Sequence, residues 1–205
     1  PASVYIPRFR NVKKQDQPYL RGFSFENYTG RNDWTRGFHQ AGVGAEWKDG
    51  LTRPGSWNVY FEAYGETLPK YYNKVTLSNT QKDKWGLPLL EIDMAYGENE
   101  RKMRSDMQET AVEMLEACDL DWVSPFDGGM MPGTVIHEMG TARMGTDRKK
   151  SVLNKWNQSH DVPNLFITDG SCMNSSPPQN PSLTYMALTA RACDYAAKAL
   201  KEKLI

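Results

Sequence analysis

Hydrophobic and polar residues alternate over much of the first half of the chain. Residues 57–64 read Trp-Asn-Val-Tyr-Phe-Glu-Ala-Tyr, and residues 89–94 read Leu-Leu-Glu-Ile-Asp-Met. An apolar residue at every second position predicts strands with one buried and one polar face, which is typical of antiparallel sheets. We therefore expect a mainly antiparallel β-sheet of about five or six strands between residues 22 and 96. Residues 1–20 are basic and irregular in pattern and predict an entering segment without regular structure.

The period of the pattern changes to that of a helix after residue 97. Apolar residues then follow one another at spacings of four, four, three and four, at Met103, Met107, Ala111, Met114 and Cys118. This spacing places them on one stripe of a helical wheel. We expect a helix over residues 98–118 that packs this stripe on one face of the sheet.

The second half of the chain has a different pattern. Residues 119–160 are rich in glycine and proline, and a loop of this length in a compact chain is usually functional or disordered. Residues 164–168 form a continuous apolar run, which is typical of a strand buried on both faces in a parallel sheet. One such strand cannot make a parallel sheet, so its neighbours must come from sequence outside this chain.

A long helix is expected after that strand. Asn180 is a plausible N-cap, and Pro181 suits the first helical position. A stripe of small and apolar residues predicts the buried face of this helix: Met186, Ala190, Cys193, Ala197 and Leu200. Without the missing sheet, we expect this stripe and the strand to be exposed or covered by a second copy of the chain in a homodimer. The fold class expected is thus α+β.

Composition excludes several classes of partner. Lys+Arg and Asp+Glu both number 25 in 205 residues, so the formal net charge of zero gives no support for binding nucleic acid or an anionic membrane. The sequence contains no run of about 18 apolar residues, so no segment of it is predicted to span a membrane. The three cysteines are widely spaced and predict neither a metal site nor a disulfide framework. A soluble protein of the cytoplasm or periplasm is expected, and the sequence does not distinguish the two compartments.

Three short segments carry groups suited to chemistry. His137 lies in a glycine-rich loop, and its imidazole titrates near neutrality, so it can act as a base. Asn180 offers an amide that can hold a hydroxyl group. Asp169-Gly170 follows the apolar run, where α/β sheets place ligands. Taken singly, each has a structural interpretation as well: a histidine bonded to a loop carbonyl, a helix cap and an ordinary turn.

Other motifs fail on inspection. Gly42-Val43-Gly44 has two of the three glycines of a dinucleotide fingerprint but lacks the last. His137-Glu138 begins like a zinc-protease motif, but Thr141 stands where the second histidine is needed. His39 and His160 have no motif around them and are expected to be structural or exposed.

The order of the three segments resembles the C-terminal region of the glucose-methanol-choline (GMC) flavoprotein oxidoreductases, which oxidise alcohols with FAD. The resemblance is densest over residues 134–203, and looks most like the branch with pyranose oxidase and bacterial sugar and gluconate dehydrogenases. It implies that His137 acts as the base beside the flavin and that Asn180 is its partner. It also implies cofactor contacts for a further set of residues, namely Asp169, Gly170, Pro181, Ser182 and Thr184.

The resemblance implies a division of the chain and a reaction. Residues 1–135 would be a substrate-binding domain, and residues 136–205 the active-site loop with the C-terminal strand and helix of an FAD-binding α/β domain. The glycine fingerprint for the ADP half of FAD is absent, so this chain alone should bind FAD weakly or not at all. The full enzyme would move hydride from a secondary alcohol of a sugar, sugar acid or polyol to FAD, with the final electron acceptor unspecified. The alternative is a non-catalytic β-rich carbohydrate-binding or interaction module.

Overall fold

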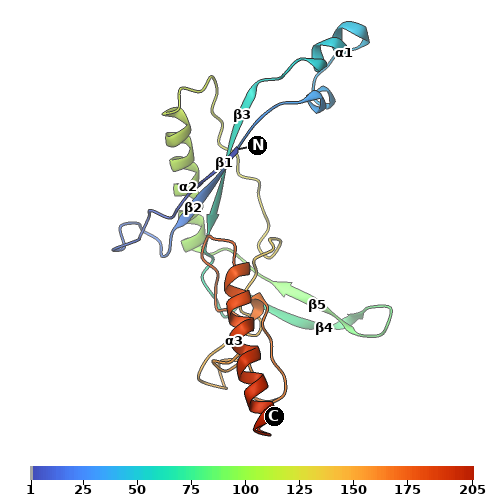
Figure 1. The fold of residues 1–205 in the computed structure, drawn as a ribbon. Helices are drawn as coiled ribbons and strands as arrows, with labels where there is room; N and C mark the ends of the chain where they lie inside the picture. The colour runs from blue at the N-terminus through green and yellow to red at the C-terminus, as the bar shows by residue number, and fades with distance from the viewer. Residues whose placement is uncertain (1) are drawn as a thin grey trace.

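The computed structural model describes residues 2–205 and shows an elongated α+β molecule built around two antiparallel sheets (Figure 1). The strands are β1 (Ala2–Ile6), β2 (Phe23–Arg31), β3 (Trp57–Gly65), β4 (Lys74–Lys82) and β5 (Pro88–Asp93). The helices are the 3₁₀ helix η1 (Trp34–Phe38), α1 (Gly44–Thr52), α2 (Glu98–Glu116), the 3₁₀ helix η2 (Gly170–Cys172) and α3 (Ser182–Lys201). No helix within residues 2–205 is long and apolar enough to cross a membrane.

The larger sheet has the strand order β1-β2-β3, and α2 covers one of its faces (Figure 1). Phe23 and Phe25, two residues apart on β2, bury their rings edge to face with centroids 5.4 Å apart. They pack with Tyr19 and with Met103 and Met107 of α2 in the main apolar core. Burial of each such side chain stabilises the fold by about 1.5–3 kcal/mol. The predicted helix is therefore confirmed over Glu98–Glu116, with Met103 and Met107 buried and Ala111 and Met114 packed against the core. Cys118, predicted as the last residue of the stripe, lies beyond the end of the helix and is exposed.

A glycine at the end of β3 permits this close packing. A Cβ atom on Gly65 would lie 2.8 Å from Cε of Met103 and in direct overlap with Met107. Real side chains do not approach so closely, so any larger residue would force the flexible ends of both methionines to repack.

The start of α2 is fixed by a buried carboxylate. Glu100 accepts hydrogen bonds from the backbone N–H of Gly97 at 2.7 Å and of Leu68 at 3.1 Å, and it pairs with Lys70. The bond to Gly97 is the glutamate half of a capping box. Burial by itself would raise the pKa of Glu100, but the bonds from Lys70, Gly97 and Leu68 hold it below its ordinary value. The same bonds turn residues 66–70 away from β3.

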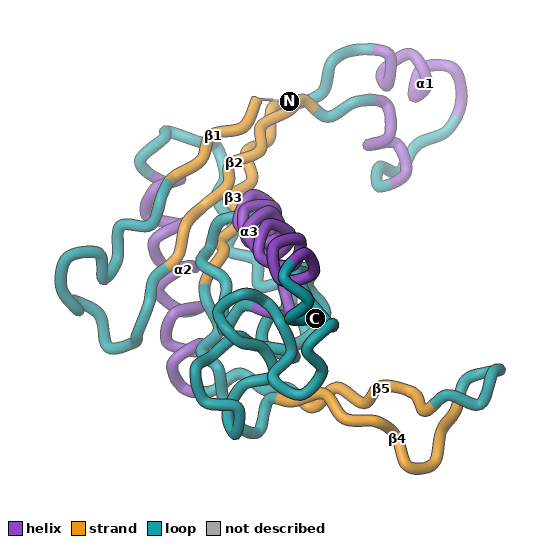
Figure 2. Tube along the Cα trace, turned by 60° about the horizontal axis from the view of Figure 1, so that its bottom comes forward, coloured by secondary structure: helices purple, strands orange, loops and turns teal. Residues whose placement is uncertain are grey.

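Because the chain turns here, the strands do not form the single sheet that was expected. The antiparallel pairing is confirmed, but the strands divide into a three-stranded sheet and a separate β4–β5 hairpin instead of forming one sheet (Figure 2). Arg21 holds Glu66 with an N–O distance of 3.2 Å, so the chain leaves the first sheet before β4 begins. On the hairpin, Val75 faces Ile92 and Leu77 faces Leu90, and all four are exposed.

Two further corrections concern the N-terminal half. Residues 1–20 were expected to lack regular structure, yet Ala2–Ile6 form β1, because they pair in register with β2. The chain between β2 and β3 was expected to be β, yet it forms an arm that carries η1 and α1 (Figure 1). Arg36 holds this arm together by donating to the carbonyls of Asp33, Gly50 and Arg53 at 2.7–2.8 Å.

The C-terminal part differs from expectation in its strand. Residues 164–168 form no strand and make only an isolated bridge between Phe166 and Gln158. A strand needs at least one neighbour with which it forms a continuous ladder, and the described chain provides only this single bridge there. Helix α3 begins at Ser182 with Pro181 as N-cap, one residue later than predicted, so Asn180 is not the N-cap.

The apolar stripe predicted on α3 is present but uncovered. All five of its residues are exposed, with Met186 at 68% and Leu200 at 66%. Instead, Ala192 and Ala199, on another side of the helix, are buried. A homodimer that covers the stripe stays a prediction, which sedimentation velocity on the purified chain would check.

Acid should weaken the fold through Glu100. Because its folded pKa lies below its unfolded value of about 4.3, its stabilisation is present at neutral pH and is lost as pH falls through the folded pKa. Glu100→Gln should lower the free energy of unfolding at pH 7 by about 1.5–3 kcal/mol, the worth of hydrogen bonds to a charged group. Urea unfolding between pH 7 and pH 3 measures both effects.

Glu113→Gln, an exposed change on the same helix, is the matched control and should leave the pH dependence unchanged. If Glu100→Gln unfolds with the wild-type pH dependence, Glu100 does not fix the start of α2.

Candidate active site

The loop that carries His137 lies beside η2. The backbone N–H of Ala142 donates to the carbonyl of Ser171 at 3.0 Å, and that of Met144 donates to the carbonyl of Cys172 at 2.9 Å. These two bonds form a short ladder between segments almost 30 positions apart in the sequence. The glycine-rich loop and the Asp-Gly turn are therefore neighbours in space.

The first turn of α3 meets the same two segments. A Cβ atom on Gly170 would lie 3.0 Å from the sulfur of Met139 and 3.2 Å from the hydroxyl of Tyr185. A larger residue at this position would require both side chains to shift by a few tenths of an ångström, so glycine favours this close approach. The structure thus brings together the His137 loop at Met139, the Asp169-Gly170 turn and the beginning of α3.

Asp169 has a local structural role. Its Oδ1 accepts a hydrogen bond from the backbone N–H of Ser171 at 2.8 Å and a second from the Ser171 hydroxyl, which caps η2. The turn interpretation of Asp169-Gly170 is therefore satisfied. Asp169 is also exposed, so its other carboxylate oxygen is open to a ligand.

The two proposed reacting side chains are uncommitted. His137 is half-buried and Asn180 is exposed, and within residues 2–205 neither side chain makes a hydrogen bond or ion pair. A histidine whose role is structural would be expected to bond a nearby carbonyl, as His160 does to Gly145 at 3.2 Å. Both His137 and Asn180 can accept or donate to a bound molecule without first breaking an internal contact.

The N-terminus of α3 is open. Pro181 is buried and has no side chain that could cap the helix, while Ser182 and Thr184 are exposed. The first backbone N–H groups of a helix have no partner inside the helix and carry partial positive charge. They fit polar or anionic oxygens such as those of FAD, which needs backbone donors and a glycine for close approach. The open N-terminus of α3 therefore fits the polar oxygens of that cofactor.

A buried polar side chain holds these segments in place. Asn157 is fully buried in the loop that precedes Phe166, and its Nδ2 donates to the carbonyl of Ile167 at 3.0 Å. Its Oδ1 lies 3.4 Å from Nη2 of Arg191 on α3, and its own carbonyl accepts from the N–H of Ile167 at 3.0 Å. Asn157 also contacts Cys172, whose thiol pKa is raised by burial. One side chain thus joins the loop, the segment before the Asp-Gly turn, η2 and α3.

Sequence reasoning did not identify Asn157 or Arg191. The one signal was a run of polar residues at 157–159 with no turn-forming glycine or proline, since a polar run in a folded loop often satisfies backbone groups. The left-handed backbone of Asn157, with φ of 61°, also fits asparagine better than most residues.

Two surface pockets lie away from this arrangement. One, of about 690 Å³, lies on the arm between Trp34 and Leu51. The other, of about 440 Å³, lies between His160, Trp156 and Tyr195, where the last two rings stack at 4.9 Å. Neither contains a predicted site residue. In the described residues no group of three His, Cys, Asp or Glu side chains could hold a metal ion.

Comparison with known proteins identifies the family. The family model described as GMC oxidoreductase matches residues 69–189, more than half of the chain. A 2-methyl-1,2-propanediol dehydrogenase of Mycolicibacterium austroafricanum is 39% identical over 66% of this chain and 24% of its own length. The fructose dehydrogenase large subunit of Gluconobacter japonicus is 31% identical over 78% of this chain and 29% of its own length. The gluconate 2-dehydrogenase flavoprotein of Pantoea cypripedii is 28% identical over 79% of this chain and 27% of its own length.

The chain therefore belongs to the GMC oxidoreductase family, and the resemblance drawn from the sequence is confirmed. The matched range includes the His137 loop, the Asp169-Gly170 turn and Asn180. The chain spans less than a third of the length of these three relatives.

Replacing Asn157 should loosen the site. Asn157→Ala leaves the carbonyl of Ile167 with one hydrogen bond fewer in a buried position, so the free energy of unfolding should fall by about 1–3 kcal/mol. Hydrogen exchange should also speed up at the amides of Ala142 and Met144, which lie in the ladder beside it. Urea unfolding and amide exchange measure the two effects.

Asn154→Ala serves as the control, because its side chain bonds only within the loop, to Gln158 and the amides of Trp156 and Gln158. Unchanged exchange at Ala142 and Met144 in a folded Asn157→Ala protein would show that Asn157 does not hold the ladder.

Proposed function

We propose that the full protein is an FAD-dependent oxidoreductase that oxidises a secondary CH–OH group of a sugar, sugar acid or polyol. The observation that carries this proposal is the meeting of three segments: the His137 loop, the Asp169-Gly170 turn and the start of α3. Family membership supports the reaction class, and the relatives include dehydrogenases named for 2-methyl-1,2-propanediol, fructose and gluconate. Because this chain covers a minor part of those relatives, the activity is proposed for the complete protein.

His137 is proposed as the general base. Oxidation of an alcohol removes a proton from oxygen and a hydride from carbon, and both events need the same alignment. The imidazole, free of internal hydrogen bonds, would take the hydroxyl proton. Asn180, exposed before α3, would hold the same hydroxyl through its amide and fix its direction. FAD, when bound, would supply the acceptor for the hydride.

The cofactor is proposed to contact residues on two sides of this site. Asp169 and Gly170 would lie against its polar chain, since one oxygen of the exposed Asp169 carboxylate is free. The start of α3 would lie against the flavin at Pro181, Ser182 and Thr184, and Ser182 and Thr184 would present their backbone N–H groups to it. We propose that residues 136–205 belong with the FAD-binding domain and that residues 1–135 form the substrate domain.

The alternative function, a non-catalytic carbohydrate-binding or interaction module, has less support. Such a module would need only the β-rich half of the chain. The family match instead runs through the glycine-rich loop and into α3, and the exposed stripe of α3 suits a helix taken from a larger domain.

Replacement of His137 should slow chemistry without releasing the cofactor. In the full-length protein, His137→Ala should lower the rate of flavin reduction by about 10²–10⁴-fold, the usual contribution of a positioned acid–base group. FAD content should persist, because the proposed cofactor contacts lie elsewhere. Anaerobic stopped-flow bleaching of the flavin measures reduction separately from reoxidation.

His39→Ala is the matched control, since His39 is exposed on the arm. Asn180→Ala should also slow reduction, and it should barely change stability because Pro181 and not Asn180 is the N-cap of α3. A folded, FAD-loaded His137→Ala enzyme that reduces its flavin at the wild-type rate would remove His137 from the mechanism.

A further inference from the structure

The face of the larger sheet opposite α2 carries two carboxylates side by side. Phe23 and Phe25 of β2 point toward α2, so the alternating residues of the strand lie on the other face. In the β2–β3 register Glu26 stands directly opposite Glu62, and in the β1–β2 register it stands opposite Tyr5. Like charges directly opposite one another destabilise a sheet. In the described part of the chain neither glutamate forms an ion pair, so no lysine, arginine or histidine side chain neutralises this pair.

Tyrosines flank the pair and leave part of each carboxylate free. The hydroxyl of Tyr28 donates to Oε2 of Glu26 at 2.6 Å, and the hydroxyl of Tyr64 donates to Oε2 of Glu62 at 2.6 Å. The hydrogen bond to Glu26 raises the pKa of Tyr28, and burial together with Glu62 raises that of Tyr64, so both phenols stay protonated as donors. Each glutamate keeps a second oxygen, Oε1, without a partner among residues 2–205.

A buried polar group on the same face also lacks a partner. Ser24 lies two residues before Glu26, on the same side of β2 and opposite Tyr64. It is fully buried, and its hydroxyl makes no hydrogen bond to any described residue. A buried hydroxyl without a partner costs about 1–3 kcal/mol, and a polar molecule bound on this face would satisfy it. Ser24 is thus a second, independent sign of a polar ligand beside the glutamates.

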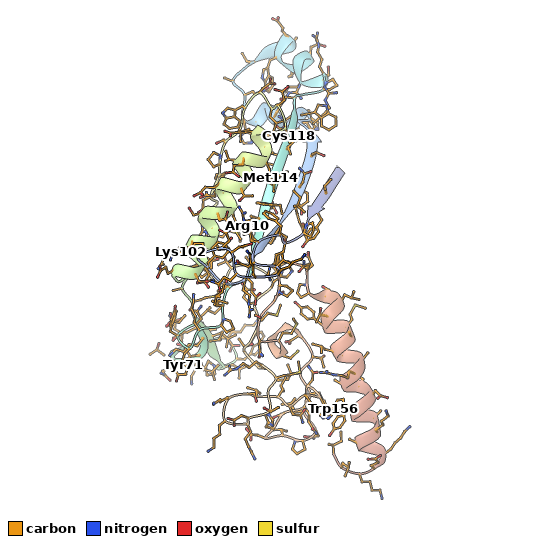
Figure 3. All side chains as sticks on the ribbon, turned by 90° about the vertical axis from the view of Figure 1, so that its left-hand side faces the viewer. Arg10, Tyr71, Lys102, Met114, Cys118 and Trp156 are labelled. Atoms are coloured by element: carbon orange, nitrogen blue, oxygen red, sulfur yellow. The ribbon has the colours of Figure 1, made fainter. Side chains whose placement is uncertain are left out.

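This face is connected to the candidate active site. Nε2 of Gln179 donates to the hydroxyl of Tyr5 at 2.8 Å, and Gln179 directly precedes Asn180. Figure 3 shows α2 along one side of the sheet and the beginning of α3 on the other side. The carboxylate pair therefore stands on the side of the sheet that the Asn180 segment approaches.

We propose that Glu26 and Glu62 form a specificity site for a polyhydroxylated substrate that carries an ammonium group, such as an amino sugar. This inference rests on the proposed alcohol oxidation and narrows its substrate. Two carboxylates with free oxygens attract an ammonium group and accept its N–H donors, while the tyrosine rings offer faces to the sugar ring. A substrate with its own carboxylate would be repelled, so the site disfavours sugar acids.

Three probes with the same pyranose ring test the proposal on the full-length, FAD-loaded protein: glucosamine, glucose and glucuronate. Anaerobic flavin reduction gives kcat/KM for each, and equilibrium dialysis gives the affinity without turnover. The expected order is glucosamine, then glucose, then glucuronate. Glu26→Gln and Glu62→Gln should each lower kcat/KM for glucosamine by about 10- to 100-fold, the effect of losing one charge-assisted hydrogen bond. Both changes should leave kcat/KM for glucose nearly unchanged and raise kcat/KM for glucuronate.

Glu91→Gln, an exposed change on β5 in the other sheet, is the matched control and should keep the wild-type order. Wild-type values that do not depend on the charge of the probe, or glutamine variants that keep the wild-type order, would overturn this inference alone. Failure of every alcohol to reduce the flavin would instead contradict the proposed function. In that case the dialysis affinities of wild type and variants still decide whether the pair selects an ammonium group.

Discussion

The hydrogen bonds of the Asn157 side chain are the constraint on which the arrangement of the C-terminal third depends. Between α2 and α3 the described chain forms no regular strand, and its backbone groups are satisfied by bonds between loop segments, such as those of Ala142 and Met144. A buried amide that donates to Ile167 and accepts from Arg191 takes over part of that function. It fixes the segment before the Asp-Gly turn against α3, and the His137 loop then pairs with η2 beside it.

The molecule therefore combines two kinds of stabilisation. The N-terminal sheet and α2 share an apolar core around Phe23, Phe25 and Met103, and a buried carboxylate, Glu100, fixes the entry to the helix. The C-terminal part depends on polar bonds and leaves its apolar stripe on α3 uncovered. The Gln179–Tyr5 bond joins the two parts at the open face of the sheet. A substrate held on that face would lie toward Asn180, which is the arrangement that the proposed oxidation requires.

The sequence predicted those elements whose pattern has one clear period. β3, β5 and α2 were found because their alternation or helical spacing is unbroken, and the family was found from the His137 and Asn180 motifs. The arm was missed because α1 has no buried stripe and is held by bonds from Arg36 to carbonyls. The strand at 164–168 was predicted wrongly because an apolar run reveals burial in the complete protein but not the neighbours it needs. The role of Asn157 was not predicted, because hydrogen bonding by a buried amide produces no hydrophobic pattern in the sequence.

The central claim is that the His137 loop and the start of α3 form one site around a flavin. A crystal structure of the full-length protein with bound FAD tests it most directly. We expect the His137 imidazole and the Asn180 amide on the same side of the flavin, each within about 3 Å of one alcohol oxygen in a substrate complex. If the two side chains lie on opposite sides of the flavin, or about 9 Å or more apart, three times a hydrogen-bond distance, they do not form one site.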